Sequence, residues 1–135
     1  MNQIKVKKPI FRQKKSEKST SPIKLELLIT VVEKKKADFY ADLIQSYNAN
    51  MQLKVLARGA AGSEILEYLG LAATDKIVLL SPVRKDKRDE IMDALEEKFK
   101  TIKNGKGISV AIPLSSVIGK QVFGFLADDE RLIKE

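Results

Sequence analysis

The chain has 135 residues, of which 44% are hydrophobic, and its formal net charge is +7. This length and apolar content predict one folded domain with its own core. The absence of cysteine and histidine excludes disulfide bonds, thiolate nucleophiles, histidine general bases and the usual zinc and iron sites. No apolar run is long enough to cross a membrane, and no apolar signal segment follows the basic N-terminus, so we expect a cytoplasmic protein.

Most of the net charge lies at the N-terminus. Residues 1–21 carry a net charge of +6, and the remainder of the chain carries +1. This stretch is rich in Lys, Ser and Gln, a composition that predicts a disordered basic tail over residues 1–22. Two roles stay open for the tail: an electrostatic arm for nucleic acid or acidic partners, and a solubilising extension.

In the first half of the domain the spacing of the apolar residues changes twice, from strand to helix and back to strand. Lys24–Glu33 is rich in branched apolar residues and predicts a strand. Ala37–Tyr47 places its apolar residues on one helical stripe, with Asp38 favouring the helix start, and predicts a helix. Met51–Arg58 alternates again and predicts a half-buried strand.

Glycines divide the next segment. Gly59 to Gly62 ends the strand, and Ser63 is a plausible N-cap for a short helix over Glu64–Leu69. Ile77–Val83 then predicts a third strand with apolar residues on both faces.

The last two elements are a long helix and a strand. A stripe of Ile91, Leu95, Phe99 and Ile102 predicts a helix from Asp86, its expected N-cap, to Lys103. Ile108–Leu114 predicts the fourth strand, with the following side chains pointing inward: Ile108, Val110, Ile112 and Leu114.

This order of elements predicts an α+β fold, a ferredoxin-like βαββαβ sandwich with an antiparallel sheet of strand order 4-1-3-2. We expect it to occupy residues 23–119, with a C-terminal extension over 120–135. Two helices cover only one face of such a sheet. Leu28, Val32, Val78 and Leu80 are expected on the other face, where a homo-oligomer or the segment Val122–Leu126 would cover them.

Three short motifs resemble the PII family of nitrogen-regulatory signal-transduction proteins and its PII-like superfamily. The stretch K-L-E-L-L-I, Lys24 to Ile29, is similar to the opening strand of the family. The G-K-G of residues 105–107 and the pair Val117-Ile118 are spaced like its B-loop, last strand and V-I pair.

The resemblance implies a homotrimer with ligand clefts between subunits, an adenine nucleotide as small-molecule effector, and regulation of a protein partner through a T-loop that begins near Gly59. The candidate ligand-binding residues are Arg58, Gly59, Gly62, Lys103, Gly105, Lys106 and Gly107. The candidate partner-binding residues lie in the short linking segment: Ile65, Leu66, Tyr68 and Leu69.

The chain departs from the family at the phosphate-binding cations. The B-loop lysine is Ile108 here, and the two later basic positions fall on Gly119 and Gln121. Binding of ATP or ADP, which the family implies, is therefore not matched by these residues, and the cofactor stays unassigned. Lys103, Lys106 and Arg58 are left to hold a smaller anion, and the favoured role of Asn104-Gly105 is to cap the preceding helix.

The sequence therefore favours a non-catalytic PII-like regulator with no metal site. A nucleic-acid-binding ferredoxin-like module is the alternative, but the predicted central strands carry no aromatic residues on which bases would stack. Nothing in the sequence assembles a nucleophile, a base and an orienting partner, so an enzyme is the least favoured class.

Overall fold

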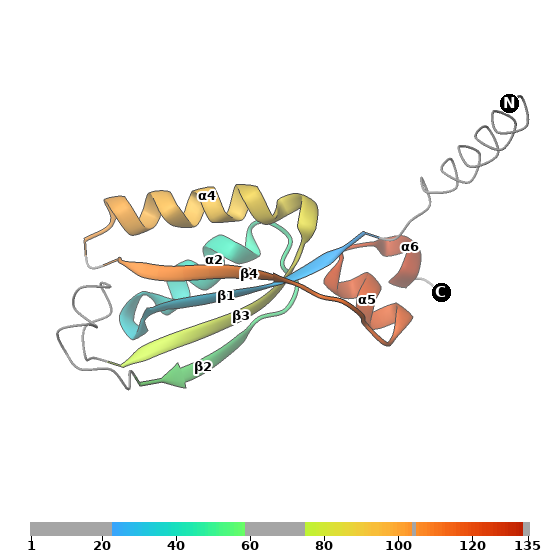
Figure 1. The fold of residues 1–135 in the computed structure, drawn as a ribbon, viewed down its shortest axis with the longest axis horizontal. Helices are drawn as coiled ribbons and strands as arrows, with labels where there is room; N and C mark the ends of the chain where they lie inside the picture. The colour runs from blue at the N-terminus through green and yellow to red at the C-terminus, as the bar shows by residue number, and fades with distance from the viewer. Residues whose placement is uncertain (1–22, 59–74, 104, 134–135) are drawn as a thin grey trace, which may run out of the picture.

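The structure is a computed structural model that describes residues 23–58, 75–103 and 105–133. Its centre is a four-stranded antiparallel sheet of order β2-β3-β1-β4 (Figure 1). The strands are β1 Leu25–Glu33, β2 Leu53–Ala57, β3 Lys76–Arg84 and β4 Gly107–Pro113. The predicted fold class and sheet order are confirmed, with the first and third strands in the centre.

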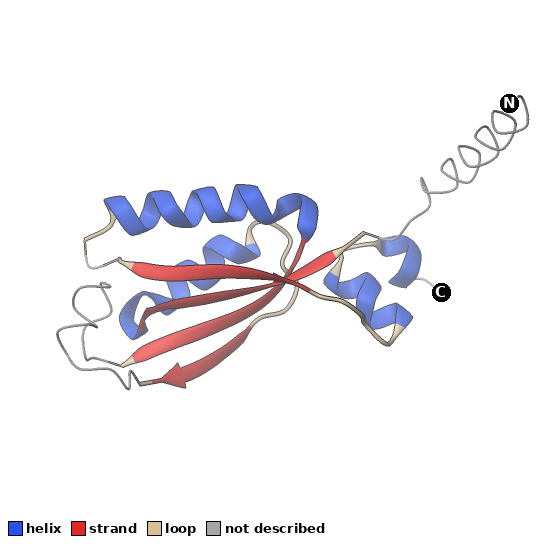
Figure 2. Ribbon diagram, in the orientation of Figure 1, coloured by secondary structure: helices blue, strands red, loops and turns tan. Residues whose placement is uncertain are grey.

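Helices α2 (Ala37–Gln45) and α4 (Lys85–Thr101) cover the same face of this sheet (Figure 2). A single 3-10 turn, Lys34–Lys36, joins β1 to α2, and two short helices follow β4: α5 Lys120–Leu126 and α6 Glu130–Ile133. None of the helices in the described ranges is long and apolar enough to cross a membrane. The predicted tail over residues 1–22 and the predicted helix Glu64–Leu69 lie outside the described residues.

The core lies between the sheet and these two helices. It contains fully or almost fully buried side chains from β1, β3, α2 and α4: Leu28, Val32, Leu79, Val83, Tyr40, Ile44, Ile91 and Leu95. Leu28 and Val32 were expected on the uncovered face, and that prediction is wrong. They lie under the helices because the polar residues on the same face of β1 find partners there. Glu26 pairs with Arg88 at 3.0 Å, and Thr30 shares a 2.9 Å hydrogen bond with Ser109.

The large apolar side chains of β4 also lie on the face opposite to the predicted one. Ile108, Val110, Ile112 and the following Leu114 are exposed, whereas Ser109 and Ala111 lie toward the helices. The reason is space, because a Cβ on Gly107 would lie 2.8 Å from the ring of Phe99 in α4. The small side chains of β4 make room for that helix, and its large ones point away from it.

The start of α4 differs from the predicted cap. Arg84 is the N-cap residue in an extended conformation, and Asp86 lies in the first turn. The guanidinium of Arg84 donates to both carboxylate oxygens of Asp86, at 2.9 and 2.7 Å, and these hydrogen bonds lower the pKa of Asp86. Asp86 therefore stabilises the helix start through the positive end of the helix and through Arg84, and makes no side-chain cap.

The face of the sheet without helices, called the open face here, is apolar on all four strands except at its ends, where Glu33, Lys76 and Arg84 also lie on it. Cross-strand pairing and alternation place on it the following residues: Leu27, Ile29, Val31, Leu53, Val55, Ala57, Val78, Leu80, Pro82, Ile108, Val110 and Ile112. Val78 and Leu80 are confirmed on this face. The prediction that β2 is half buried is wrong, because four of its five residues are exposed.

The C-terminal helices cover only one end of the open face. Leu126 and Ala127 are buried with Leu25, and Ile23 and Phe123 pack against this group. Folding back of Val122–Leu126 therefore occurs, but on the open face the edge strands β2 and β4 stay exposed and the middle of the central strands is only half-buried. A contiguous apolar surface of this kind is typical of an interaction surface.

Candidate functional site

Lysines gather at the end of the sheet where β1 and α4 finish. A shallow pocket of about 420 Å³ is lined by Glu33, Lys35, Lys36 and Lys103. Lys35 and Lys36 come from the turn after β1, and Lys103 comes from the segment after α4. The ends of β1 and α4 lie on the same side of the molecule (Figure 1). We call these four residues the lysine pocket.

The lysine pocket has the chemistry of an anion site. Within the described part of the chain, none of its three ammonium groups is in an ion pair. Each ammonium has three donors on a flexible stem and can adapt to a phosphate or carboxylate. With one carboxylate against three ammonium groups, the pocket favours a negatively charged ligand.

Of the predicted ligand-binding residues, the lysine pocket contains Lys103 alone. Lys106 is exposed in the turn before β4 and does not line it. Arg58 is exposed and directly follows Ala57, the last residue of β2. Ala57 pairs with Lys76 of β3, and Lys76 pairs with Glu33 of β1. Arg58 therefore shares this end of the sheet but lies two strands away from Glu33, about 10 Å.

Gly59, Gly62 and the four candidate partner-binding residues lie outside the described residues. Lys35 and Lys36 were missed by the sequence analysis. The signal that could have found them is the run of three lysines directly after the first strand.

The two glycines of the G-K-G motif are required by packing. A Cβ on Gly105 would lie 2.8 Å from both Ile102 Cβ and the hydroxyl of Tyr40, and one on Gly107 would lie 2.7 Å from the carbonyl oxygen of Val31. The C-cap of α4 is Ile102, and neither glycine has a positive φ, so neither Gly105 nor Gly107 forms a left-handed cap of α4. Asn104 lies outside the described residues.

Tyr40 anchors this turn. Its buried hydroxyl donates to the carbonyl oxygen of Gly105, and its ring packs on Phe99 with centroids 5.2 Å apart. Burial raises the pKa of Tyr40, so the hydroxyl stays protonated at neutral pH and remains a donor. This hydrogen bond fixes the backbone of Gly105 against α2.

We expect Gly105→Ala to lower the free energy of unfolding by about 1–3 kcal/mol, because the new methyl group must displace Ile102 or Tyr40. Chemical denaturation measures this change. Lys106→Ala is the matched control, since Lys106 is exposed in the same turn, and we expect its change to stay within about 0.5 kcal/mol. Equal stability of the two variants would show that Gly105 is not held in close packing.

Nothing in the described residues suggests a metal centre. The chain has no cysteine or histidine, and no group of three or more Asp and Glu side chains among the described residues is placed to hold an ion.

The fold is shared with solved structures of PII-like proteins. One, described as a PII-like signaling protein from Thermus thermophilus, is 20% identical with a TM-score of 0.52, over 68% of this chain and 87% of that one. CPII from Thiomonas intermedia, solved with ADP, AMP and acetate bound, is 15% identical with a TM-score of 0.57, over 75% and 94%. A protein of unknown function from Pediococcus pentosaceus is 13% identical with a TM-score of 0.55, over 73% and 99%.

No protein-family model and no curated protein matches the sequence. The similarity is therefore one of fold. The chain has the α+β fold of PII-like signaling proteins, and the resemblance predicted from its motifs is confirmed at the level of the fold.

Proposed function

We propose that this protein is a non-catalytic PII-like regulator that binds a small phosphorylated ligand at the lysine pocket and controls a protein partner. The observation that carries the proposal is the convergence of Lys35, Lys36 and Lys103, without ion-pair partners among the described residues, at one end of a PII-like fold. The bound ADP and AMP of the Thiomonas protein support a nucleotide as the ligand class.

A mono- or diphosphate fits the residues better than a triphosphate does. The family lysine is Ile108 here, and Ile108 lies on the open face beside Val31, where it supplies no charge. The three lysines of the pocket would replace the missing cations only in part. We therefore propose that AMP or ADP binds more tightly than ATP.

The working form in this proposal is a homotrimer in which the open face is covered by neighbouring copies. Isolated monomers rarely expose a contiguous apolar surface that spans every strand of a sheet, and closed symmetric assemblies are the common way to bury one. Such an assembly would place the lysine pockets at the ends of the sheets. The proposed role of Ile65, Leu66, Tyr68 and Leu69 in partner binding stays a prediction.

Calorimetric titration of the full chain with AMP, ADP, ATP and inorganic phosphate tests the ligand. We expect saturable binding of AMP or ADP, and at least about tenfold weaker binding for the triple variant Lys35→Gln, Lys36→Gln, Lys103→Gln, because three cations are removed. The control is Lys24→Gln with Lys85→Gln, which removes two charges at the opposite end of the sheet.

Binding that is unchanged in the triple variant, or equally weakened in the control, would place the ligand elsewhere. No heat with any of the four compounds would overturn the ligand proposal.

A further inference from the structure

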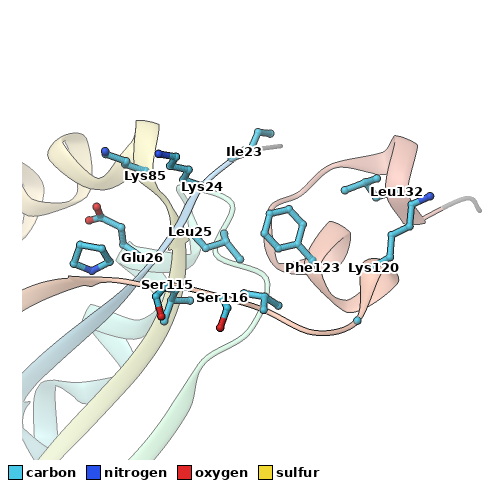
Figure 3. Close-up of a pocket in the computed structure, with 14 residues that line it drawn as sticks. Ile23, Lys24, Leu25, Glu26, Lys85, Ser115, Ser116, Lys120, Phe123 and Leu132 are labelled. Atoms are coloured by element: carbon cyan, nitrogen blue, oxygen red, sulfur yellow. The ribbon is translucent and has the colours of Figure 1, made fainter. Parts of the chain in front are cut away.

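A second pocket lies at the other end of the sheet from the lysine pocket. It has a volume of about 940 Å³ and opens between the sheet and the C-terminal helices (Figure 3). Its residues come from the start of β1, the start of α4, the segment after β4 and the two C-terminal helices. It is separated from the lysine pocket by the length of β1, nine residues or about 30 Å. We call it the C-terminal pocket.

Most of its lining is apolar. Leu25 and Phe123 line it (Figure 3), and Phe123 packs against the small buried cluster of Leu25, Leu126 and Ala127 that holds α5 on the sheet. Leu114, Val117 and Leu132 extend this apolar lining. A volume of this size and an apolar wall are typical of a site for a small organic molecule.

Two lysines give one rim of the C-terminal pocket a positive charge. Lys24 and Lys85 are adjacent, since the backbone N–H of Lys85 donates to the carbonyl oxygen of Lys24 at 2.9 Å. Their side chains lie on the same side of the pocket, above Glu26 (Figure 3). Within the described residues neither ammonium group is in an ion pair.

The only carboxylate among the described residues that line this pocket is already compensated. Glu26 is 2% exposed, and both of its oxygens accept from the guanidinium of Arg88, at 3.0 and 3.4 Å. Lys85 is also the first residue of α4, where the positive end of a seventeen-residue helix adds to the field. The net potential at this rim is therefore positive, beside an apolar interior.

We propose that the C-terminal pocket binds an organic anion with an apolar body, such as an aliphatic carboxylate, whose head group lies at Lys24 and Lys85 and whose chain lies along Leu114, Val117 and Phe123. The rim charge also disfavours the basic N-terminal segment as occupant, since residues 1–21 carry a net charge of +6. No residue of this site belongs to the lysine pocket, so the site is independent of the function proposed above.

The test titrates the full chain with sodium decanoate, octanoate and hexanoate, and with decanamide as a neutral match. Because each buried methylene contributes about 0.8 kcal/mol, we expect affinity to rise about fourfold for each methylene added. We expect decanamide to bind at least about fivefold more weakly than decanoate, since it has no charge to pair with the lysines.

The double variant Lys24→Gln, Lys85→Gln should weaken decanoate binding about tenfold and leave decanamide binding unchanged. The control Lys35→Gln, Lys36→Gln removes the same charge at the opposite end of the sheet and should leave decanoate binding unchanged. The chain has no tryptophan, so Phe123→Trp also provides a single reporter whose emission should shift to shorter wavelength as decanoate is added.

Three results would overturn the proposal. They are absence of decanoate binding to the unchanged chain, equal binding of decanoate and decanamide, and equal weakening by the two double variants. Tight decanoate binding to the Phe123→Trp variant without a change in its tryptophan emission would place the ligand away from Phe123 and would also contradict the proposal.

Discussion

Replacing Leu79 with alanine is expected to lower the free energy of unfolding by about 2–5 kcal/mol. Leu79 is fully buried in the centre of β3, on the face that α2 and α4 cover. The substitution removes three carbon atoms and leaves a cavity in a close-packed layer, which costs both transfer free energy and contacts. Chemical denaturation at a fixed protein concentration measures the change.

The control for this prediction is Ile118→Ala. Ile118 is 97% exposed in the segment between β4 and α5, so the same kind of truncation should change the stability by no more than about 0.5 kcal/mol. A small effect at Leu79, comparable to that at Ile118, would mean that the helices do not cover this face of the sheet.

Replacing Val110 with aspartate is expected to convert the proposed trimer into a folded monomer. Val110 lies in the middle of β4 on the open face, opposite Ile29 of β1, and is 46% exposed in the single chain. In an assembly that covers the open face, the carboxylate would be buried without a partner in every copy, at a cost of several kcal/mol each. In a monomer it would stay in water.

Sedimentation velocity of the variant and the unchanged chain measures this effect, and circular dichroism establishes that the variant is folded. Gln45→Glu adds the same charge at an exposed position of α2 and should leave the mass unchanged. If Val110→Asp sediments like the unchanged chain, the open face is not the contact between copies.

The alternation of apolar residues predicted the strands, the two long helices and the sheet order, because these depend on local pattern and on the handedness of connections. The same pattern did not determine which face of β1 meets the helices, since both of its faces are apolar. That choice depends on partners far away in the chain, Arg88 for Glu26 and Ser109 for Thr30.

Strand β4 contains a signal that sequence analysis could have used. Gly107, Ser109 and Ala111 are small and alternate with large residues, and a strand packed closely against a helix turns its small side chains toward it. The inward assignment of Ile108, Val110 and Ile112 followed hydrophobicity alone. It was wrong because the open face has no cover within the described part of the chain.

The candidate site was predicted only in part, because it also depends on segments that meet only in the folded chain. Lys103 was identified from its place beside the glycines, whereas Lys35 and Lys36 meet it only because β1 and α4 end at the same edge of the fold. The C-terminal pocket was not predicted at all. It forms from three parts of the chain, residues 23–26, Lys85 and residues 113–132, and no local pattern marks their meeting.

Sedimentation equilibrium of the unchanged chain tests most directly whether other copies cover the open face. We predict a mass three times that of the 15.1 kDa chain at micromolar protein concentration. A mass of a single chain over the same concentrations would contradict the account, because the apolar residues of all four strands would then be in contact with water.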